Sequence, residues 1–506
     1  MSEASNTRTA AFARVSPHAF AAAPVAALVF VTLLALAAIA VRHGLIADDA
    51  LRLWAGASTA ADGEVPIGRV VAAYPSLPFM STTLVAWLLP AGAPAPELVT
   101  ALVLALFAAC CFSACRRAGV PTAAAAAATL LIALHPALLR AVVAGPGDMF
   151  FAAFLLMLCL SLYDLRARSG TAEVMNVGLA LMGLTFSHPM GAVFAFAAVP
   201  FLAFAVRPVL VANSAANILI ALVFPTLFTL AAFAYVAWIF PGDGWSFFAA
   251  PAQSLSMWTA AVARLFGGYL SGVPMLEASA AMALALAVGA PLAVTMLILV
   301  RRRRPLVAPA AVFIAAAILA TAVSVVSGFF GDPAALVVAA PVLSAGMMTR
   351  VPAARERLVL ALCLLVVGWL GGFLSLALVD PLTISSLQSA GASERLDALA
   401  AGGAARGRDG VLIDVNNAPA FVLGRGNASG ILSPQSEAFL LAQLFGRVDS
   451  PFVAVPDPQS TTGANDRLDT VFPTLFRDGL SGYRLIYQNN TWRLFGREKK
   501  ETVSKQ

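Results

Sequence analysis

The chain has 506 residues, of which 60% are hydrophobic and only 11% are charged. A soluble domain carries about 25% charged residues, so this composition excludes a water-soluble protein of this size. The net charge is +6, but the basic residues form short clusters at the ends of apolar runs, which argues against nucleic-acid binding. The five cysteines all fall inside apolar runs, so the sequence indicates neither a disulfide framework nor a metal cluster.

Eleven apolar runs lie in the first three quarters of the chain. A helix needs about 20 apolar residues to cross a membrane, and the runs predict about eleven transmembrane helices within residues 19–379, after a cytoplasmic segment at 1–18. The runs are Ala19–Val41, Pro96–Cys115, Pro121–Leu139, Met149–Leu165, Ala172–Ser187, Pro189–Val206, Ser214–Phe240, Met275–Val300, Leu306–Phe329, Pro333–Thr349 and Leu358–Val379.

The arginines predict the orientation of these helices. If the N-terminus is inside, all six inner segments carry arginine, as the positive-inside rule requires. These arginines are Arg8, Arg14, Arg116, Arg117, Arg166, Arg168, Arg207, Arg301 to Arg304, Arg350, Arg355 and Arg357. We therefore expect a multi-pass protein of the bacterial inner membrane whose C-terminal part lies in the periplasm.

Two long outer loops are expected, at residues 43–95 and 241–274. The first contains an apolar stretch up to Leu89 that is too short to cross the membrane comfortably, so we expect a helix at the outer surface. The second is rich in aromatic residues, which favours an interfacial loop.

The residues after Val379 are of a different kind, since 26 of the 58 charged residues follow it. Strands are predicted at Gly410–Val415 and Phe452–Val455, helices at Ser436–Phe445 and Asp466–Phe476, and a hairpin around Asn489-Asn490. The sequence thus predicts a small extracytoplasmic α/β domain at 380–497, followed by a polar tail at 498–506.

Carboxylates at the outer surface are the first candidates for chemistry. Asp48 and Asp49 open a helix-like stretch after the first membrane helix, and Asp148 lies in Gly145-Pro146-Gly147-Asp148, where the chain re-enters the membrane. Capping of a helix start is the alternative role for each of them. Two adjacent acids in a chain with so little charge favour a functional role.

Histidines and arginines at the same surface are candidates for binding phosphate or metal. His43, His135 and His188 fall there, and Arg52 and Arg140 are outer arginines that could pair with an anionic head group. Arg140 lies eight residues before Asp148 on the same connection.

The order of several short motifs resembles the GT-C superfamily of membrane glycosyltransferases, especially the aminoarabinose lipid A transferases and protein mannosyltransferases. The motifs are Asp48-Asp49-Ala50-Leu51, Tyr74-Pro75-Ser76-Leu77, Arg116-Arg117-Ala118-Gly119, Asp148 before the next helix, and Gly183 to Gly191. They cover residues 19 to 350.

This resemblance implies a GT-C-like transmembrane domain and an inverting transfer of sugar from a polyprenyl-phosphate donor to an envelope glycan or glycolipid. It implies that Asp48, with Asp49 beside it, and Asp148 are catalytic. Arg52, Tyr74, Arg140, His188 and His43 would bind substrate. The family usually has Glu-Lys before a pair of prolines, where this chain has Ala72-Ala73-Tyr74 and Ser76 in place of the second proline. It often has Lys-Gly where this chain has Ser187-His188. These differences remove a likely metal ligand and two phosphate-binding lysines, and a divalent metal is left open as a cofactor.

Three other functions compete with this one. A transporter usually has charges in mid-helix, whereas here they cluster at helix ends. A non-catalytic assembly protein of envelope polysaccharide synthesis would use the fold without the chemistry. A polysaccharide polymerase or ligase would use the same lipid-linked substrates.

Overall fold

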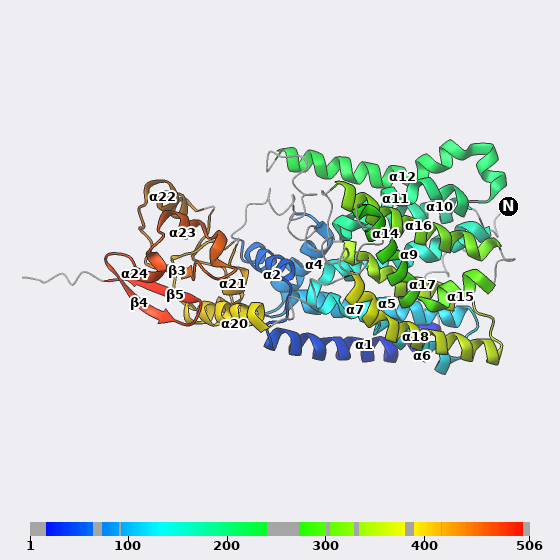
Figure 1. The fold of residues 1–506 in the computed structure, drawn as a ribbon, viewed down its shortest axis with the longest axis horizontal. Helices are drawn as coiled ribbons and strands as arrows, with labels where there is room; N and C mark the ends of the chain where they lie inside the picture. Colours follow the sequence, from blue (N-terminus) through cyan, green and yellow to red (C-terminus); the bar gives the residue numbers. More distant parts are fainter. Residues whose placement is uncertain are drawn as a thin grey trace, which may run out of the picture.

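The computed structural model describes residues 17–63, 73–90, 93–168, 170–239, 273–299, 304–327, 333–379, 389–415, 417–434 and 436–498. A bundle of helices forms one part of the elongated molecule, and a smaller domain with a sheet lies beyond one end of the bundle (Figure 1). We call the end nearest this domain the domain-side end.

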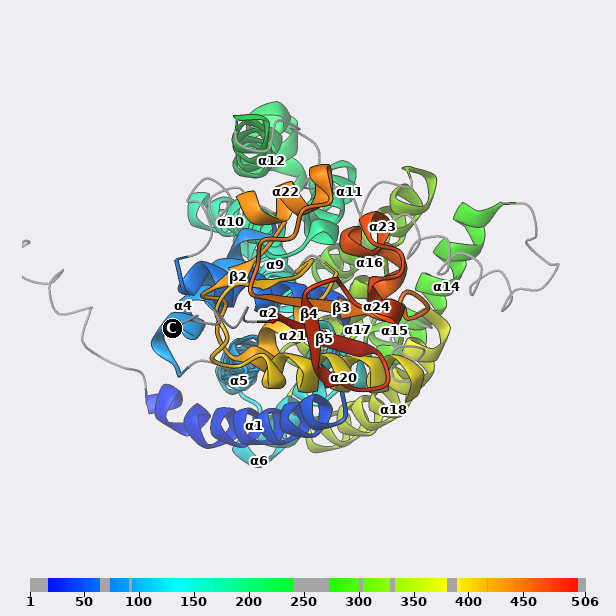
Figure 2. The same ribbon diagram turned by 90° about the vertical axis from the view of Figure 1, so that its left-hand side faces the viewer.

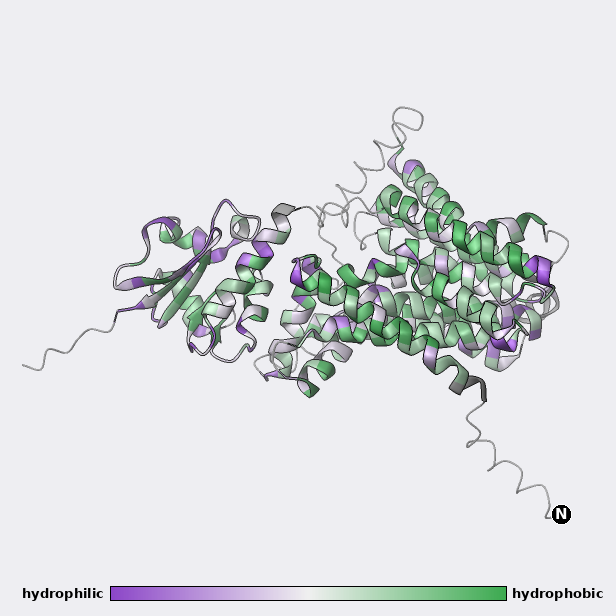
Figure 3. Ribbon diagram, turned by 90° about the horizontal axis from the view of Figure 1, so that it is seen from below, coloured by the Kyte–Doolittle hydropathy of each residue, from purple (hydrophilic) through white to green (hydrophobic). Residues whose placement is uncertain are grey.

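Six helices of the described part are long and apolar enough to cross a membrane. They are α1 (Pro17–Arg42), α5 (Ala95–Arg117), α9 (Pro146–Arg168), α12 (Pro208–Ile239), α16 (Arg304–Ser327) and α18 (Arg355–Val379). Hydrophobic residues dominate the bundle, and hydrophilic ones gather in the C-terminal domain and near the bundle ends (Figure 3). The chain is therefore a helical membrane protein.

Two further pairs of helices reach the length and apolarity of a membrane span only when each pair is taken together, and each pair is bent at a short break. In the first, α6 (Thr122–Ala133) is followed after a bend of 52° by α7 (Pro136–Leu139) and α8 (Ala141–Ala144). In the second, α14 (Pro274–Gly289) is followed by α15 (Pro291–Leu299) at 89°. Pro136 and Pro291 stand at the breaks, because proline cannot donate the backbone hydrogen bond that would continue the helix.

The other three predicted spans are shorter helices. They correspond to α10 (Thr171–Ser187), α11 (Pro189–Ala205) and the pair η3 (Pro333–Val338) and α17 (Ala339–Met348). All eleven predicted runs are helical, but six to eight meet the criteria of length and apolarity. The count of eleven crossings stays a prediction.

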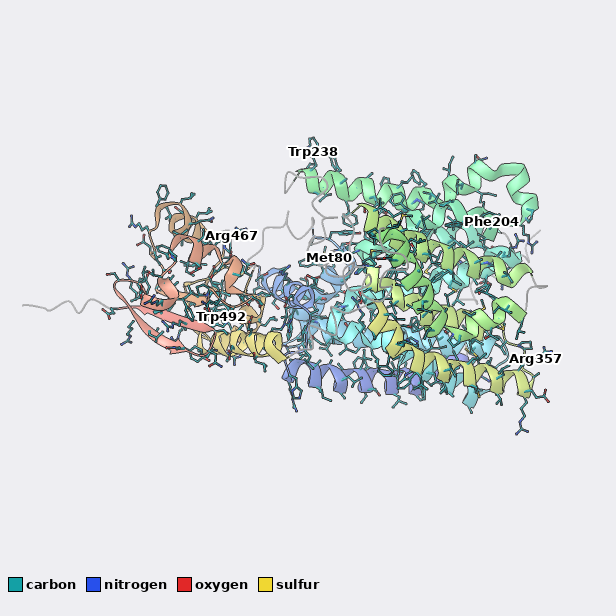
Figure 4. All side chains as sticks on the ribbon, in the orientation of Figure 1. Met80, Phe204, Trp238, Arg357, Arg467 and Trp492 are labelled. Atoms are coloured by element: carbon teal, nitrogen blue, oxygen red, sulfur yellow. The ribbon has the colours of Figure 1, made fainter. Side chains whose placement is uncertain are left out.

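Arginines meet at the end of the bundle away from the C-terminal domain. Arg166 donates to the carbonyl of Val206, Arg207 Nε donates to the carbonyl of Arg166 at 3.2 Å, and Arg350 lies 3.8 Å from Asp164. Arg357 stands at this same far end (Figure 4). Clusters far apart in sequence thus share one end of the bundle.

The described residues of the first predicted outer loop include the helices α2 (Asp48–Ala61) and α4 (Ser76–Leu88). At 1.5 Å per residue, the 13 residues of α4 extend roughly 20 Å, less than the roughly 30 Å of a bilayer core. A helix is present where the surface helix was predicted, and it is shorter than the bilayer core is thick. The second predicted loop, the segment 1–16 and the tail from 499 lie outside the described residues.

The C-terminal domain begins with α20 (Ser389–Ala404) and contains a five-stranded sheet of order β2-β1-β3-β5-β4. The strands are β1 (Val411–Leu412), β2 (Ile431–Leu432), β3 (Phe452–Pro456), β4 (Tyr483–Gln488) and β5 (Trp492–Arg497). β1 is parallel to both β2 and β3, with Val411 opposite Ile431 and Phe452. β5 is antiparallel to β3 and β4.

Successive strand residues point to opposite sides of this sheet, and helices cover both faces. Val411 and Ile413 pack with α20 and with α21 (Pro419–Arg425). Leu412 packs on the other side with α22 (Glu437–Phe445), α23 (Arg467–Val471) and α24 (Leu475–Asp478). Figure 2 shows α20 and α21 on one side of the strands and α22 and α23 on the other.

Each predicted element of this domain has a counterpart, with three differences. The strand predicted at Gly410–Val415 is limited to Val411–Leu412. The expected helix Asp466–Phe476 is split into α23 and α24, and Pro473 lies between them. The helices α20 and α21 and the strand β2 were not predicted. β2 has only two residues, and α20 is rich in alanine and glycine, so neither has a strong apolar period.

Candidate functional site

The site is built around the start of α2. Asp48 and Asp49 are its first two residues, and the preceding Ala47 gives no side-chain cap. The two carboxylates therefore do not cap the helix, although the helix dipole favours them by about 0.3–1 kcal/mol each. The backbone N–H of Ala47 donates to the carbonyl of Val143 at 3.0 Å, which ties the start of α2 to α8.

A glycine turn brings α9 against this start. Gly145 has φ +102, and a Cβ there would stand 3.1 Å from the Cβ of Ala50. A Cβ on Gly147 would stand 3.5 Å from the imidazole of His188. Gly145 thus allows the close approach of α2 to the α8–α9 turn, whereas a side chain at Gly147 would make an ordinary van der Waals contact with His188.

Asp148 forms a buried ionic cluster at this meeting point. It accepts a hydrogen bond from Arg140, and His188 Nε2 lies 3.5 Å from its Oδ1. The side chains of Arg140 and Asp148 are only 7% and 5% exposed, and that of His188 is 18% exposed. His188 Nδ1 accepts the N–H of Met190 at 3.0 Å, so the neutral imidazole carries its proton on Nε2, facing Asp148.

Asp49 and Arg52 form a separate, exposed pair on α2. They lie 3.8 Å apart on one face of this helix, with side chains 82% and 55% exposed. The structure therefore joins three of the predicted site residues, Arg140, Asp148 and His188, in one cluster. The helix start that carries Asp49 and Arg52 packs against the α8–α9 turn beside this cluster.

The side chain of Asp48 points in a different direction from that of Asp49, because neighbouring helix residues point about 100° apart. Its Oδ1 accepts from Nε of Arg395 on α20 at 3.2 Å. The apolar face of α2 continues this contact with the C-terminal domain, since Leu51 and Trp54 share a buried cluster with Phe421 of α21. Asp48 thus stands between the membrane part and the C-terminal domain.

Tyr74 and His43 lie beside the cluster rather than in it. The hydroxyl of Tyr74 donates to the carbonyl of Thr185 at 3.0 Å, and its ring meets Phe233 edge-on. It therefore holds the start of α4 against α10. His43 is exposed after the end of α1, and no hydrogen bond or ion pair joins it to Asp148 in the described part of the chain.

The placement of His135 at the outer surface is wrong. It is buried between α6 and α7, and its Nε2 lies 3.2 Å from the carbonyl of Gly289 and 3.0 Å from that of Gly368. Its Nδ1 accepts the N–H of Ala137, so Nε2 is the donor to both carbonyls. His135 links the two broken helices to α18 and has no ring nitrogen left for a ligand.

Several polar residues of this region were missed by the sequence interpretation. Glu394 and Arg395 belong to α20, which was not predicted. Glu97 and Glu277 are 4% and 5% exposed near the starts of α5 and α14. An acid inside an apolar run is itself a signal of function, and it was overlooked.

The described residues contain no group of three His, Cys, Asp or Glu side chains that could hold a metal ion. The ion pairs of Asp148 within the described part of the chain are with His188 and with Arg140, and an arginine cannot bind a metal ion.

No family model, curated protein or solved structure matches this chain. What the cluster does must therefore be argued from its own chemistry.

Proposed function

We propose that the protein transfers a sugar from a polyprenyl-phosphate carrier to a hydroxyl group of an envelope glycan or glycolipid. The observation that carries the proposal is the packing of the start of α2, with Asp48, Asp49 and Arg52, against the α8–α9 turn that holds the Arg140–Asp148–His188 cluster. The carboxylates of α2, the exposed guanidinium of Arg52 and the buried cluster would then lie where the phosphate of a lipid-linked sugar could arrive from the bilayer.

The orientation belongs to the same proposal. Arginines at the far end of the bundle would lie in the cytoplasm of a bacterium, following the positive-inside rule. The site and the C-terminal domain would then face the periplasm. Nucleotide sugars are absent there, which makes a lipid-linked donor the sensible source of activated sugar.

In the proposed step, Asp48 accepts the proton of the acceptor hydroxyl as its oxygen bonds to the anomeric carbon. The bond between that carbon and the phosphate oxygen breaks, and the polyprenyl phosphate leaves with the electron pair. The configuration at the anomeric carbon inverts. Arg52, which is 55% exposed, would stabilise the departing phosphate.

Asp148 and Arg140 have a supporting role in this scheme. Their charges already compensate each other in a buried pair, so they would orient His188 and the α8–α9 turn. A divalent metal would need ligands in addition to Asp148 and His188, and no step of the scheme uses a metal.

A non-catalytic assembly protein is the second candidate. It is favoured by the pairing of Asp48 with Arg395 and of Asp148 with Arg140, because both acids then have structural partners. A polymerase or ligase of envelope polysaccharide would share the donor and differ in the acceptor.

The decisive experiment measures sugar transfer from polyprenyl-phosphate sugars by the full-length protein in nanodiscs. Asp48→Asn should lose at least about 100-fold in rate, since general-base catalysis contributes 10²–10⁴. Asp62→Asn, at the other end of α2, is the matched control and should stay active. Equal rates for Asp48→Asn and the unchanged protein would disprove the role of Asp48. Absence of transfer with every donor would favour the assembly function.

A further inference from the structure

A polar pocket lies between the membrane part and the C-terminal domain. Its walls include Asp48 and Arg52 of α2, Glu394 and Arg395 of α20, and Asn417 and Thr461 of the C-terminal domain. We call this the interdomain pocket. It lies on the Asp48 side of α2, whereas the Arg140–Asp148–His188 cluster lies against Asp49.

The carboxyl ends of strands β1 and β3 face this pocket. β1 has β2 on one side and β3 on the other, so the chain order reverses beside β1. Ligands of open α/β sheets bind beyond the carboxyl ends of the strands at such a reversal. Asn417 follows β1 and Thr461 follows β3, and both line the pocket.

The polar groups of the pocket are held in place by one another. The N–H of Thr461 donates to Oε2 of Glu394 at 3.1 Å, and its hydroxyl donates to the same oxygen. Arg395 donates to Asp48 at 3.2 Å and to the carbonyl of Gly44 at 3.3 Å. The pocket is therefore pre-organised across the boundary between the two parts of the chain.

The charges of the pocket compensate each other. Two carboxylates, Asp48 and Glu394, face two guanidinium groups, Arg52 and Arg395. An anion would meet two carboxylates there, and a cation would meet two guanidinium groups. A neutral ligand with many hydroxyl groups can donate to the carboxylates and accept from the guanidinium, amide and hydroxyl groups at once.

We propose that the interdomain pocket binds a neutral sugar residue of the acceptor, so that the C-terminal domain supplies the acceptor half of the site. The proposal rests on the proposed function, because it gives the bound hydroxyl to Asp48 as proton acceptor. It assigns Glu394, Asn417 and Thr461 to acceptor binding.

The test measures binding of neutral methyl hexosides to the full-length protein in nanodiscs, without any donor, by saturation-transfer NMR. Gly391→Tyr fills the pocket from α20, where the atoms nearest to a new Cβ belong to the guanidinium of Arg395, at 3.5 Å or more. Ala400→Tyr, at an exposed position of the same helix, is the matched control. Glu394→Gln is a milder second variant that keeps the size of the side chain.

We expect at least one methyl hexoside to bind the unchanged protein and Ala400→Tyr. Gly391→Tyr should bind it at least about tenfold more weakly, and Glu394→Gln should also bind less tightly. Equal binding by Gly391→Tyr and Ala400→Tyr, or no binding of any hexoside to the unchanged protein, would overturn the proposal. Preference for glucuronic acid or inorganic phosphate would overturn it as well.

Transfer assays separate this inference from the proposed function. If the unchanged protein transfers sugar and Gly391→Tyr does so with the same KM for the acceptor, the pocket is not the acceptor site and the transferase function stands. If hexosides bind in the pocket but no donor supports transfer, the pocket is a glycan site of a non-catalytic protein. The inference that the pocket binds a neutral sugar then holds, although the proposed sugar transfer does not.

Discussion

Asp48 and Arg395 are 347 residues apart in sequence and form an ion pair across the boundary between the membrane part and the C-terminal domain, with Oδ1 and Nε 3.2 Å apart. The Asp48 side chain is 65% exposed, and an exposed pair stabilises a protein by only about 0.2–1 kcal/mol. The pair therefore positions Asp48 but cannot be what holds the domain.

The first prediction is that Trp54 holds the C-terminal domain. Trp54 is 6% exposed in the cluster that α2 shares with α20 and α21, and truncating a buried tryptophan costs about 3–5 kcal/mol. Trp54→Ala should therefore speed hydrogen exchange in α2 and α20 far more than Arg395→Gln does. Trp238→Ala, at a residue 64% exposed, is the control. Equal exchange in Trp54→Ala and Arg395→Gln would show that the ion pair matters as much as the apolar contact.

The second prediction concerns the buried pair of Arg140 and Asp148. Removing one partner leaves an uncompensated buried charge, which costs about 3–5 kcal/mol, whereas removing both is often neutral. Arg140→Gln should therefore unfold at a much lower temperature than the double variant Arg140→Gln, Asp148→Asn. The measurement is the midpoint of thermal unfolding in detergent. If the effects of the two single changes simply add, the pair is not coupled.

The third prediction is that His135 is structural. Its Nε2 donates to the Gly289 carbonyl, and an unsatisfied buried acceptor costs about 1–3 kcal/mol. Gly372 leaves room for the ring, since a Cβ there would lie 2.6 Å from Cε1 of His135. Both His135→Leu and Gly372→Ala should lower the midpoint of thermal unfolding, while His43→Leu should not. Full stability of His135→Leu would contradict this role.

Much of the fold could be predicted from the sequence because its signals are local. Apolar length identifies helices such as α5 and α9, and turn residues such as Asn489-Asn490 identify the β4–β5 hairpin. The breaks in two spans were missed, although Pro136 and Pro291 were visible, because a proline in an apolar run is compatible with a bent or a continuous span.

The candidate site could be predicted only in part, for a reason of geometry. Asp49, Arg52, Arg140, Asp148 and His188 could be grouped because their charges lie at helix ends that the arginine pattern predicts on one side of the membrane. The different directions of Asp48 and Asp49 depend on the rotation of α2, and the contacts of Arg395 depend on how two domains pack. No local pattern encodes either of these.

The fourth prediction tests the orientation. In a chain whose five native cysteines are replaced, a single cysteine at Leu444, which is 71% exposed, should react with an impermeant thiol reagent added outside intact cells. A cysteine at Arg357 should react only after the cells are opened, because Arg357 lies at the far end of the bundle. Cysteines at Ser76 and Ala93, on either side of α4, should both react from outside. The reverse pattern would invert the proposed topology.

The last prediction concerns the stability of the C-terminal domain at different pH values. Asp466 is 3% exposed, and burial, with Asp414 nearby, raises the pKa of its carboxyl group from 3.8 to about 7. Between these two pH values the unfolded chain has lost this proton and the folded domain keeps it. The free energy of unfolding should therefore fall as pH rises, by at most about 1.4 kcal/mol per pH unit from this group.

Asp466→Asn should remove this slope, because asparagine stays neutral and can still accept the N–H of Leu468 that Asp466 accepts at 2.9 Å. Hydrogen exchange of the amides of β3 and β5, corrected for its intrinsic pH dependence, measures the stability at pH 5 and pH 8. Asp478→Asn, an acid whose side chain is 60% exposed, is the control and should keep the slope. If Asp466→Asn loses as much stability between pH 5 and pH 8 as the unchanged protein, another group must carry the dependence. If it is less stable at both pH values, the carboxylate charge itself stabilises α23.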